Sequence, residues 1–295
     1  MKIIDVIGDT PLVEISTPRE SGKVFVKVES FNAGGSIKSR VAQHMVVHAE
    51  MEGQLHPGDT IVEPTGGNTG IGLALAAAIR GYHFVATVPD NYSARRVNLL
   101  RVHGAEVHLS NSSLGNDSHI KLAKQILISH PEYVHLDQFT NLACIAAHYE
   151  GTGQEILKKC VPDVFVCSVG SGATFTGVGR CLRDAKPDVK LYVVQPLGAD
   201  IVEGTSVSHS IQGTSLGIKP PLMDYAILDG TIEVTWDDVK SELHDLARVE
   251  GLYLGPSSGA NIWAARMLAA KMGRGVVVCT VAPDGGYYYP EVFEK

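Results

Sequence analysis

A lysine in a glycine-rich context offers the clearest chemistry in this chain. Lys38 follows two glycines and a serine in the segment Asn32-Ala33-Gly34-Gly35-Ser36-Ile37-Lys38-Ser39-Arg40, after an apolar run typical of a strand. A lysine amine that folding removes from water has a lowered pKa, and the neutral amine attacks carbonyl carbons. The residue type alone favours an ordinary surface lysine. The context makes Lys38 a candidate nucleophile.

Three further glycine-rich segments carry polar side chains where a strand is expected to give way to a helix. They are residues 63–70 (EPTGGNTG), 170–174 (GSGAT) and 255–259 (GPSSG). Backbone N–H groups at such turns, together with the helix dipole, bind phosphate or carboxylate groups. A tight strand–helix turn or a helix cap is the alternative interpretation of each segment.

The spacing of these glycines disfavours the common nucleotide-binding motifs. A dinucleotide fingerprint would need glycine at position 175, where the chain has Phe175, and the pair Gly70-x-Gly72 fails in the same way at Leu75. No G-x-x-x-x-G-K-[ST] segment occurs in the sequence. The sequence therefore disfavours dinucleotides and nucleoside triphosphates as ligands.

Strand-like and helical runs alternate along the chain, and this alternation predicts βαβ units with mostly parallel sheets flanked by helices. Strands are expected at residues 24–28, 60–63, 83–88, 106–109, 133–136, 164–169, 191–194 and 276–281. Helices are expected at residues 70–80, 92–103, 116–129, 142–159, 174–184, 236–250 (with Thr235 as N-cap) and 257–272. Residues 198–229 are polar and irregular, which is typical of a functional loop.

Length and composition are those of a globular protein of about two domains. The 295 residues are 44% hydrophobic and 19% charged, with a net charge of −7 that argues against nucleic acid as a partner. The sequence contains no long apolar run and no signal peptide, so a cytoplasmic protein without a membrane span is expected. The five cysteines contain no C-x-x-C pair, and Cys167 and Cys279 are expected to be buried.

Together, the four glycine-rich segments resemble the pyridoxal-phosphate β-replacement family of cysteine synthase and cystathionine β-synthase. The family lysine pattern N-P-x-x-S-x-K-D-R is matched except at Ala33 and Ser39, and the family loop T-S-G-N-T is matched at residues 65–69 except at Gly66. Gln138 lies in a segment similar to the family's Q-[FY]-x-N, and residues 209–213 are similar to H-x-I-Q-G. The resemblance covers nearly the whole chain.

The resemblance implies an α/β, two-domain, fold-type II enzyme with its active site between the domains. Residues 39–139 would form a smaller mobile domain, and residues 1–38 and 140–295 a larger one that binds the cofactor phosphate. Lys38 would be the catalytic residue and would carry pyridoxal 5'-phosphate as a Schiff base. The implied cofactor-binding residues are Lys38, Asn68, Gly170, Ser171, Gly172, Ala173, Thr174 and Ser257. The implied substrate-binding residues are Thr65, Gly66, Gly67, Asn68, Thr69 and Gln138, with no metal.

The implied reaction is β-replacement on serine, O-acetylserine or O-phosphoserine through an aminoacrylate. Sulfide or another thiol would add to give cysteine or a thioether amino acid such as cystathionine. A homodimer is expected because it is the commonest closed assembly. Three alternatives stay open: a nitrogen nucleophile with a diaminopropionate-type product, a serine dehydratase, and a non-catalytic, partner-binding relic of the fold. The dehydratase pattern S-F-K-x-R-G departs from this chain at Val41.

Two departures from the family bear on the choice of substrate. Gly66 replaces a serine, and residues 214–216 (TSL) replace a stretch that is usually glycine-rich and aromatic. A missing side chain at position 66 is expected to leave room for a larger substrate or nucleophile. Cysteine synthesis from O-acetylserine and sulfide is therefore predicted not to be the best reaction of the protein.

Overall fold

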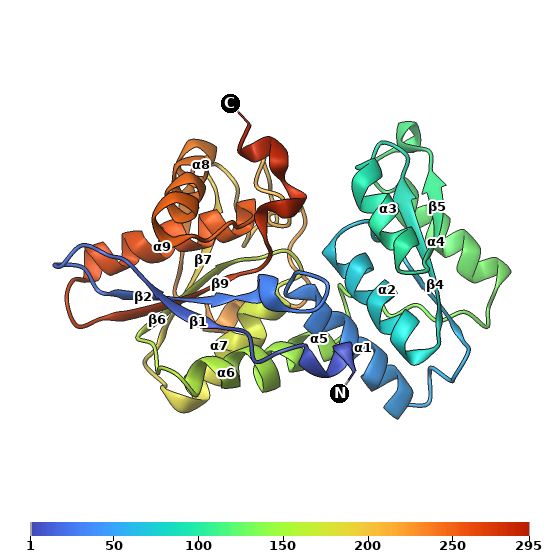
Figure 1. Cartoon of the computed structure of the whole chain (residues 1–295), viewed down its shortest axis with the longest axis horizontal. Helices are drawn as coiled ribbons and strands as arrows, with labels where there is room; N and C mark the ends of the chain where they lie inside the picture. The colour runs from blue at the N-terminus through green and yellow to red at the C-terminus, as the bar shows by residue number, and fades with distance from the viewer. Residues whose placement is uncertain (1, 295) are drawn as a thin grey trace. The chain divides into compact units, whose positions relative to one another are not determined.

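The computed structural model describes residues 2–294, which divide by their contacts into two compact units. The first unit contains the chain up to Ile7 and Asn32–Cys144, and the second contains Gly8–Phe31 and the chain from Ile145 onward. Each unit has its own sheet with helices on both faces (Figure 1). The chain is therefore an α/β protein.

The second unit contains a six-stranded sheet in the order β1-β2-β9-β6-β7-β8. All neighbouring strands are parallel except β1 and β2. Helices α8 and α9 pack on one face of this sheet, and α6 and α7 pack on the other. The elements are β1 (Leu12–Ile15), β2 (Lys23–Val28), α6 (Gln154–Leu157), β6 (Val164–Ser168), α7 (Ala173–Ala185), β7 (Lys190–Pro196), β8 (Gly230–Val234), α8 (Trp236–Asp245), α9 (Pro256–Met272) and β9 (Val277–Ala282).

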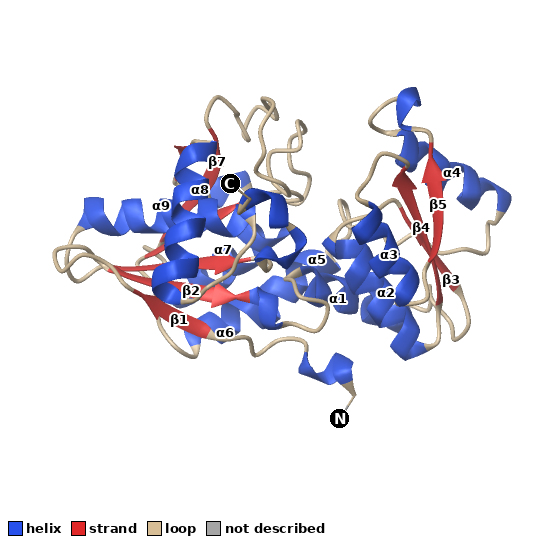
Figure 2. Cartoon of the chain, turned by 45° about the horizontal axis from the view of Figure 1, so that its top comes forward, coloured by secondary structure: helices blue, strands red, loops and turns tan. Residues whose placement is uncertain are grey.

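The first unit contains a parallel sheet in the order β3-β4-β5, drawn in red beside its helices in Figure 2. Helix α4 covers one face through Val62, Val85 and Ala123, and α2 and α3 cover the other. The elements are α1 (Lys38–Met51), β3 (Thr60–Glu63), α2 (Asn68–Arg80), β4 (His83–Pro89), α3 (Ala94–Val102), β5 (Glu106–Ser110) and α4 (Ser118–Ser129).

Glycines set the close packing of α2 against α1. A Cβ atom at Gly72 would lie 3.0 Å from the Cβ of Ala42 and 3.0 Å from the backbone oxygen of Lys38. A larger residue would push the two helices apart at the turn that begins with the candidate nucleophile. Gly72 thus serves the packing of α2 against α1, while a Cβ at Gly70 would instead lie 2.9 Å from the backbone oxygen of Thr65.

Most predicted strands and helices are confirmed to within two residues, and the differences have physical causes. The long helix expected at residues 142–159 is divided into α5 (Ala143–Ala146), a π-helix (Ala147–Gly153) and α6, and the π segment contains two glycines, which are poor helix formers. The strand expected at 133–136 was wrong, since only Val134 forms a bridge, to Ile61. Helix α1 and strands β1 and β8 were not predicted, and in β8 buried and exposed positions alternate within a polar context.

Thr235 caps α8 as predicted, and its hydroxyl exchanges hydrogen bonds with Asp238 in a capping box. All five cysteines are free thiols, and Cys167 and Cys279 are fully buried, as predicted. Within residues 2–294, no helix has the length and apolar character to cross a membrane. The same residues contain no group of three or more His, Cys, Asp or Glu side chains placed to hold a metal ion.

Candidate active site

Lys38 begins α1 at the end of a tight glycine turn. Gly34 and Gly35 have φ values of +86° and +72°, and a Cβ at Gly34 would lie 2.8 Å from the Ser39 hydroxyl. Ser36 accepts the backbone N–H of Lys38 at 3.2 Å, and the buried Ser39 donates to the carbonyl of Ala33. The two glycines are required because other residues rarely adopt this left-handed backbone.

The Lys38 amine lies in surroundings poor in water. Burial lowers the pKa of Lys38 below its ordinary value, and the nearby Cys144 thiol acts more weakly in the opposite direction. Burial raises the pKa of Cys144 to about 12, so the thiol is neutral and does not form an ion pair with the amine. A desolvated lysine without an ionised partner holds a larger share of neutral, nucleophilic amine.

Residues 65–69 connect the end of β3 to the start of α2. Gly67 is the N-cap of α2, and no side chain caps this helix end. The first N–H groups of a helix have no intrahelical acceptors, so they favour an anion such as a carboxylate. Thr69 is buried, and its hydroxyl donates to Oε1 of the buried Gln138 at 2.6 Å. The first unit thus joins the predicted carboxylate loop to the predicted glutamine.

The space expected at Gly66 is occupied. A Cβ at this position would lie 2.7 Å from a methyl group of Val88 and 2.8 Å from the ring of Tyr92. The hydroxyl of Tyr92 also lies 3.4 Å from where a Cβ on Gly67 would be. The expectation of extra room at Gly66 was therefore wrong, because the tyrosine ring takes the place of the missing side chain.

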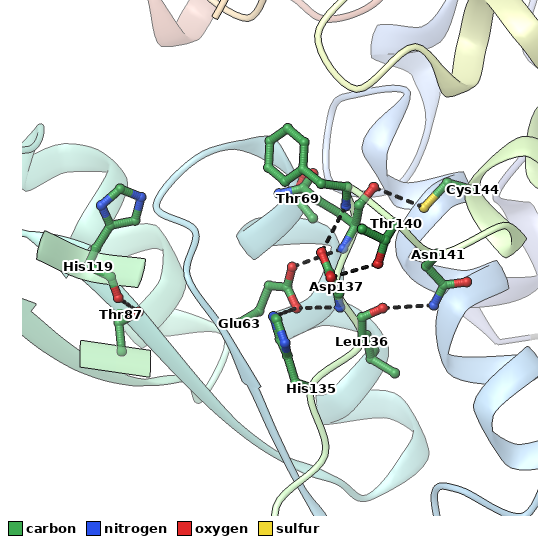
Figure 3. A network of polar contacts seen from close by, with 12 residues as sticks. Glu63, Thr69, Thr87, His119, His135, Leu136, Asp137, Thr140, Asn141 and Cys144 are labelled. Atoms are coloured by element: carbon green, nitrogen blue, oxygen red, sulfur yellow. Dashed lines mark hydrogen bonds and ion pairs between the residues drawn. The ribbon is translucent and has the colours of Figure 1, made fainter. Parts of the chain in front are cut away.

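Glu63 is a site feature that sequence analysis missed. It ends β3 and is 1% exposed, and its carboxylate accepts the backbone N–H groups of Asp137 and Gln138 (Figure 3). Burial raises the pKa of Glu63 to about 7. The sequence did contain a signal for this residue, because a charged side chain follows the apolar pair Ile61-Val62 directly before a glycine-rich turn.

The turn at residues 170–174 follows β6 and opens α7 in the second unit. Gly172 is the N-cap with φ +95°, and no side chain caps α7. A Cβ at Gly172 would lie 2.5 Å from the backbone nitrogen of Met223, so only glycine fits. Ser171 is buried, and the Thr174 hydroxyl hydrogen-bonds Nε2 of the fully buried His148 at 3.1 Å. Backbone N–H groups and two hydroxyls are a donor set suited to a phosphate.

Residues 214–216, which differ from the family pattern, hydrogen-bond the residue before this turn. The hydroxyl of Thr214 donates to the carbonyl of Val169 at 3.0 Å, and the N–H of Ser215 donates to the same carbonyl at 3.1 Å. A Cβ at Gly170 would lie 2.8 Å from the carbonyl oxygen of Gly213. The irregular region thus packs directly on the residue that precedes the turn.

Ser257 lies buried in the first turn of α9. Asn261, one turn later, accepts the N–H of Ser168 at 2.6 Å and donates to the carbonyl of Val281 at 2.8 Å. These bonds fix α9 to the ends of β6 and β9. The buried Asp284 also holds this helix start, because its carbonyl oxygen accepts the N–H of Gly255 at 3.1 Å. Ser257 therefore lies at the same edge of the sheet as the 170–174 turn.

Taken separately, each unit offers groups that fit pyridoxal phosphate, and the first also offers a place for the carboxylate of an amino-acid substrate. The first unit supplies a desolvated amine for an aldehyde and an uncapped helix start for a carboxylate. The second supplies an uncapped glycine turn for a phosphate and a buried hydroxyl at the start of α9. His148, Tyr92 and Asp284 were missed by sequence analysis, because each acts through a partner distant in sequence.

The sequence matches a known family over most of its length. Residues 3–284 match the family described as "Pyridoxal-phosphate dependent enzyme". A probable cysteine synthase of Bacillus subtilis is 39% identical over 294 residues, covering 96% of this chain and 94% of the relative. The O-ureido-L-serine synthase of Streptomyces lavendulae is 38% identical over 296 residues, covering 99% and 91%.

The fold has close structural counterparts. The crystal structure of O-acetyl serine sulfhydrylase isoform 3 from Entamoeba histolytica superposes with a TM-score of 0.94 at 32% identity. That match covers 98% of this chain and 90% of the other. The predicted fold-type II class is therefore confirmed.

Proposed function

The chain belongs to the pyridoxal-phosphate dependent enzyme family, and we propose that it catalyses β-replacement on serine or an O-activated serine. The leaving group would be hydroxide, acetate or phosphate, and sulfide or another thiol would add to give cysteine or a thioether such as cystathionine. The observation that carries this proposal is the desolvated amine of Lys38 in the same unit as the Thr69–Gln138 pair. The similarity to the probable cysteine synthase of Bacillus subtilis supports it.

Different residues of the chain would bind the cofactor and the substrate. Lys38 and Asn68 of the first unit would hold the cofactor, with Ser257 and the turn Gly170, Ser171, Gly172, Ala173 and Thr174 of the second. Thr65, Gly66, Gly67, Asn68, Thr69 and Gln138 would bind the substrate carboxylate. When bound, pyridoxal phosphate supplies an electron sink for the pair left on the substrate Cα.

Lys38 Nζ would remove the proton from the substrate Cα, because its lowered pKa leaves a neutral amine to accept it. The N–H groups at the start of α2 would orient the substrate through its carboxylate. The Ser257 hydroxyl would lie against the ring nitrogen and leave it unprotonated, which favours elimination over transamination.

Borohydride trapping tests the assignment of Lys38. The holoenzyme is reduced, digested and mapped, and the pyridoxyl label is expected on the peptide that contains Lys38. Lys38→Ala should lose both the visible absorbance of the bound cofactor and turnover. A label on another lysine would contradict the assignment. Product analysis with serine, O-acetylserine and O-phosphoserine, each with sulfide and homocysteine, then tests the reaction.

A nucleophile other than a thiol is the second candidate. The similarity to O-ureido-L-serine synthase favours it, because that name gives a product with a ureido group attached to serine through oxygen. Turnover with amine and hydroxylamine-type nucleophiles but not with sulfide would support this second reaction.

The proposal also covers assembly and motion. We expect a cytoplasmic homodimer, in which residues 39–139 move on substrate binding. Light scattering measures the assembly, cell fractionation the location, and X-ray scattering with and without substrate the motion.

A further inference from the structure

We propose that Glu63 is a positioning residue, whose ionised carboxylate holds the turn at residues 135–138 so that Gln138 meets Thr69. The inference rests on the proposed function, because it takes Gln138 and Thr69 as groups that bind the substrate carboxylate. Glu63 does not itself touch the substrate in this account. It acts through the backbone of the turn.

The geometry of the carboxylate supports this role (Figure 3). Oε2 accepts the N–H of Asp137 at 3.1 Å, and Oε1 accepts the N–H of Gln138 at 3.2 Å. A backbone hydrogen bond from Leu136 also lowers the pKa of Glu63. Since a carboxylate has about four acceptor sites, one side chain satisfies successive N–H groups of the turn. Hydrogen bonds to an ionised acceptor are the stronger kind.

The turn needs such support because its backbone is strained. Asp137 has φ +50°, a left-handed conformation that non-glycine residues rarely adopt. Its own side chain accepts hydrogen bonds from Phe139 and Thr140, and Asn141 donates to the carbonyl of Leu136 at 2.8 Å. These contacts close one side of the turn, and Glu63 provides the acceptors on the other.

Gln138 is thereby held at three points. Its N–H bonds Glu63, its carbonyl accepts from the Cys144 thiol at 3.5 Å, and its side-chain Oε1 accepts from Thr69. With Oε1 engaged by Thr69, the side chain presents its amide N–H groups as donors. A substrate carboxylate needs donors, so this orientation is the productive one.

Glu63 is the group of this cluster that changes charge near neutral pH. Burial raises its pKa to about 7, while the N–H bonds from Gln138 and Asp137 act to lower it. The neighbouring titratable groups are His135 and Asp137 of the turn and Cys144 of α5. The charge of Lys124 lowers the pKa of His135, and the charge of Lys38 lowers the pKa of Cys144. Burial lowers the pKa of His135, whose ring lies 3.4 Å from Glu63, and so favours the uncharged form of this ring. At a pH above the pKa of Glu63 the carboxylate accepts both N–H bonds. At a pH below it one oxygen carries a proton, and the bonds weaken.

Hydrogen exchange of the native protein tests the inference without any substrate. Exchange of the N–H groups of Asp137 and Gln138 is measured at about pH 6 and about pH 8, corrected for the intrinsic rate. The relevant openings break these two N–H bonds while Glu63 stays buried, and for them protection is expected to be about tenfold higher at the higher pH, in line with the strength of charge-assisted bonds. Glu63→Gln should lower the protection and remove its pH dependence.

A matched control is Glu242→Gln. Glu242 is another buried carboxylate whose pKa burial raises, and it pairs with Arg266 at 3.1 Å in the second unit. Its removal should leave the protection of the turn unchanged. If Glu63→Gln fails to fold, Glu63→Asp keeps the charge on a shorter side chain, and should lower protection while keeping its pH dependence.

Steady-state kinetics of the holoenzyme provide the second readout. The KM for the amino-acid donor should rise about tenfold from about pH 8 to about pH 6, with kcat changed less. Glu63→Gln should show the raised KM at both pH values. A variant with defective folding alone would lose kcat through inactive protein and would leave KM unchanged.

The two measurements separate this inference from the proposed function. If native protein turns over serine derivatives but protection and KM do not depend on the ionisation of Glu63, the inference is wrong and the function stands. If protection follows Glu63 but no β-replacement occurs with any donor, the function is wrong and the positioning of Gln138 stands.

Discussion

The two helix starts proposed to bind anions are built on the same plan but depend on glycine for different reasons. Both α2 and α7 follow a parallel strand and begin at a glycine N-cap without a capping side chain. At α7, Gly172 is dictated by the backbone, since its φ is +95° and a Cβ would meet the backbone of Met223. At α2, Gly66 is dictated by side chains, since Tyr92 and Val88 occupy the space of a Cβ.

The difference teaches which of the two turns can change. A turn limited by backbone atoms admits no other residue, because the backbone cannot be substituted away. Where a tyrosine ring limits the turn, a smaller residue in place of that tyrosine would leave room for a side chain on the turn itself. The turn at residues 170–174, proposed to bind phosphate, is therefore the fixed region, and the loop at residues 65–69, proposed to bind carboxylate, is the region where we expect substrate choice to vary.

Gly172→Ala should have the largest effect. The strained φ and the displacement of Met223 together are expected to cost about 2–5 kcal/mol in stability or cofactor affinity. Cofactor titration and urea unfolding measure the loss. Gly213→Ala is the matched control, because Gly213 has φ +85° with open space around its Cβ position. An equal loss in both variants would show that backbone contact is not what fixes the phosphate turn.

Glu63→Gln should change how stability depends on pH. The folded protein binds the Glu63 proton more tightly than the unfolded chain, so this residue lowers stability as pH rises from about 4.5 through about 7. The full loss above that range is about 3 kcal/mol, from about 1.4 kcal/mol per unit of pKa shift. Urea unfolding at about pH 5 and about pH 8 should show a flatter profile for the variant. An unchanged profile would mean that the pKa of Glu63 is not raised.

Gly66→Ser should destabilise the carboxylate loop by about 1–3 kcal/mol, the usual cost of overpacking. Adding Tyr92→Ala should relieve the clash, so the double variant loses less than the sum of the single ones. Thermal unfolding and binding of an amino-acid carboxylate measure the coupling. Additive losses would show that Tyr92 does not limit position 66.

Thr174→Val should have the smallest effect. It removes one hydrogen bond, to His148, which is expected to cost about 1 kcal/mol in cofactor affinity. Thr174→Ser keeps the hydroxyl and serves as the control. A loss as large as that of Gly172→Ala would reverse the order of importance within the turn.

Much of the fold followed from local pattern. The buried parallel strand β6 is apolar from Val164 to Cys167, and helices such as α9 end at glycine, so both were predictable. The start of α1 was missed because its glycines break the helical pattern before Lys38. The division of the 142–159 helix was missed, although Gly151 and Gly153 of its π segment were a local signal against an uninterrupted α-helix.

The sequence by itself determined the α/β class, the parallel sheets and the segments that carry Lys38, residues 65–69 and residues 170–174. It could do so because strand composition, helix caps and glycine turns are local properties of the chain. Only the tertiary structure decided that Tyr92 fills the space at Gly66, that His148 backs Thr174 and that Glu63 holds the turn of Gln138. These contacts join residues 26 to 75 positions apart, and burial, which raises the pKa of Glu63, exists only once the chain has folded around it.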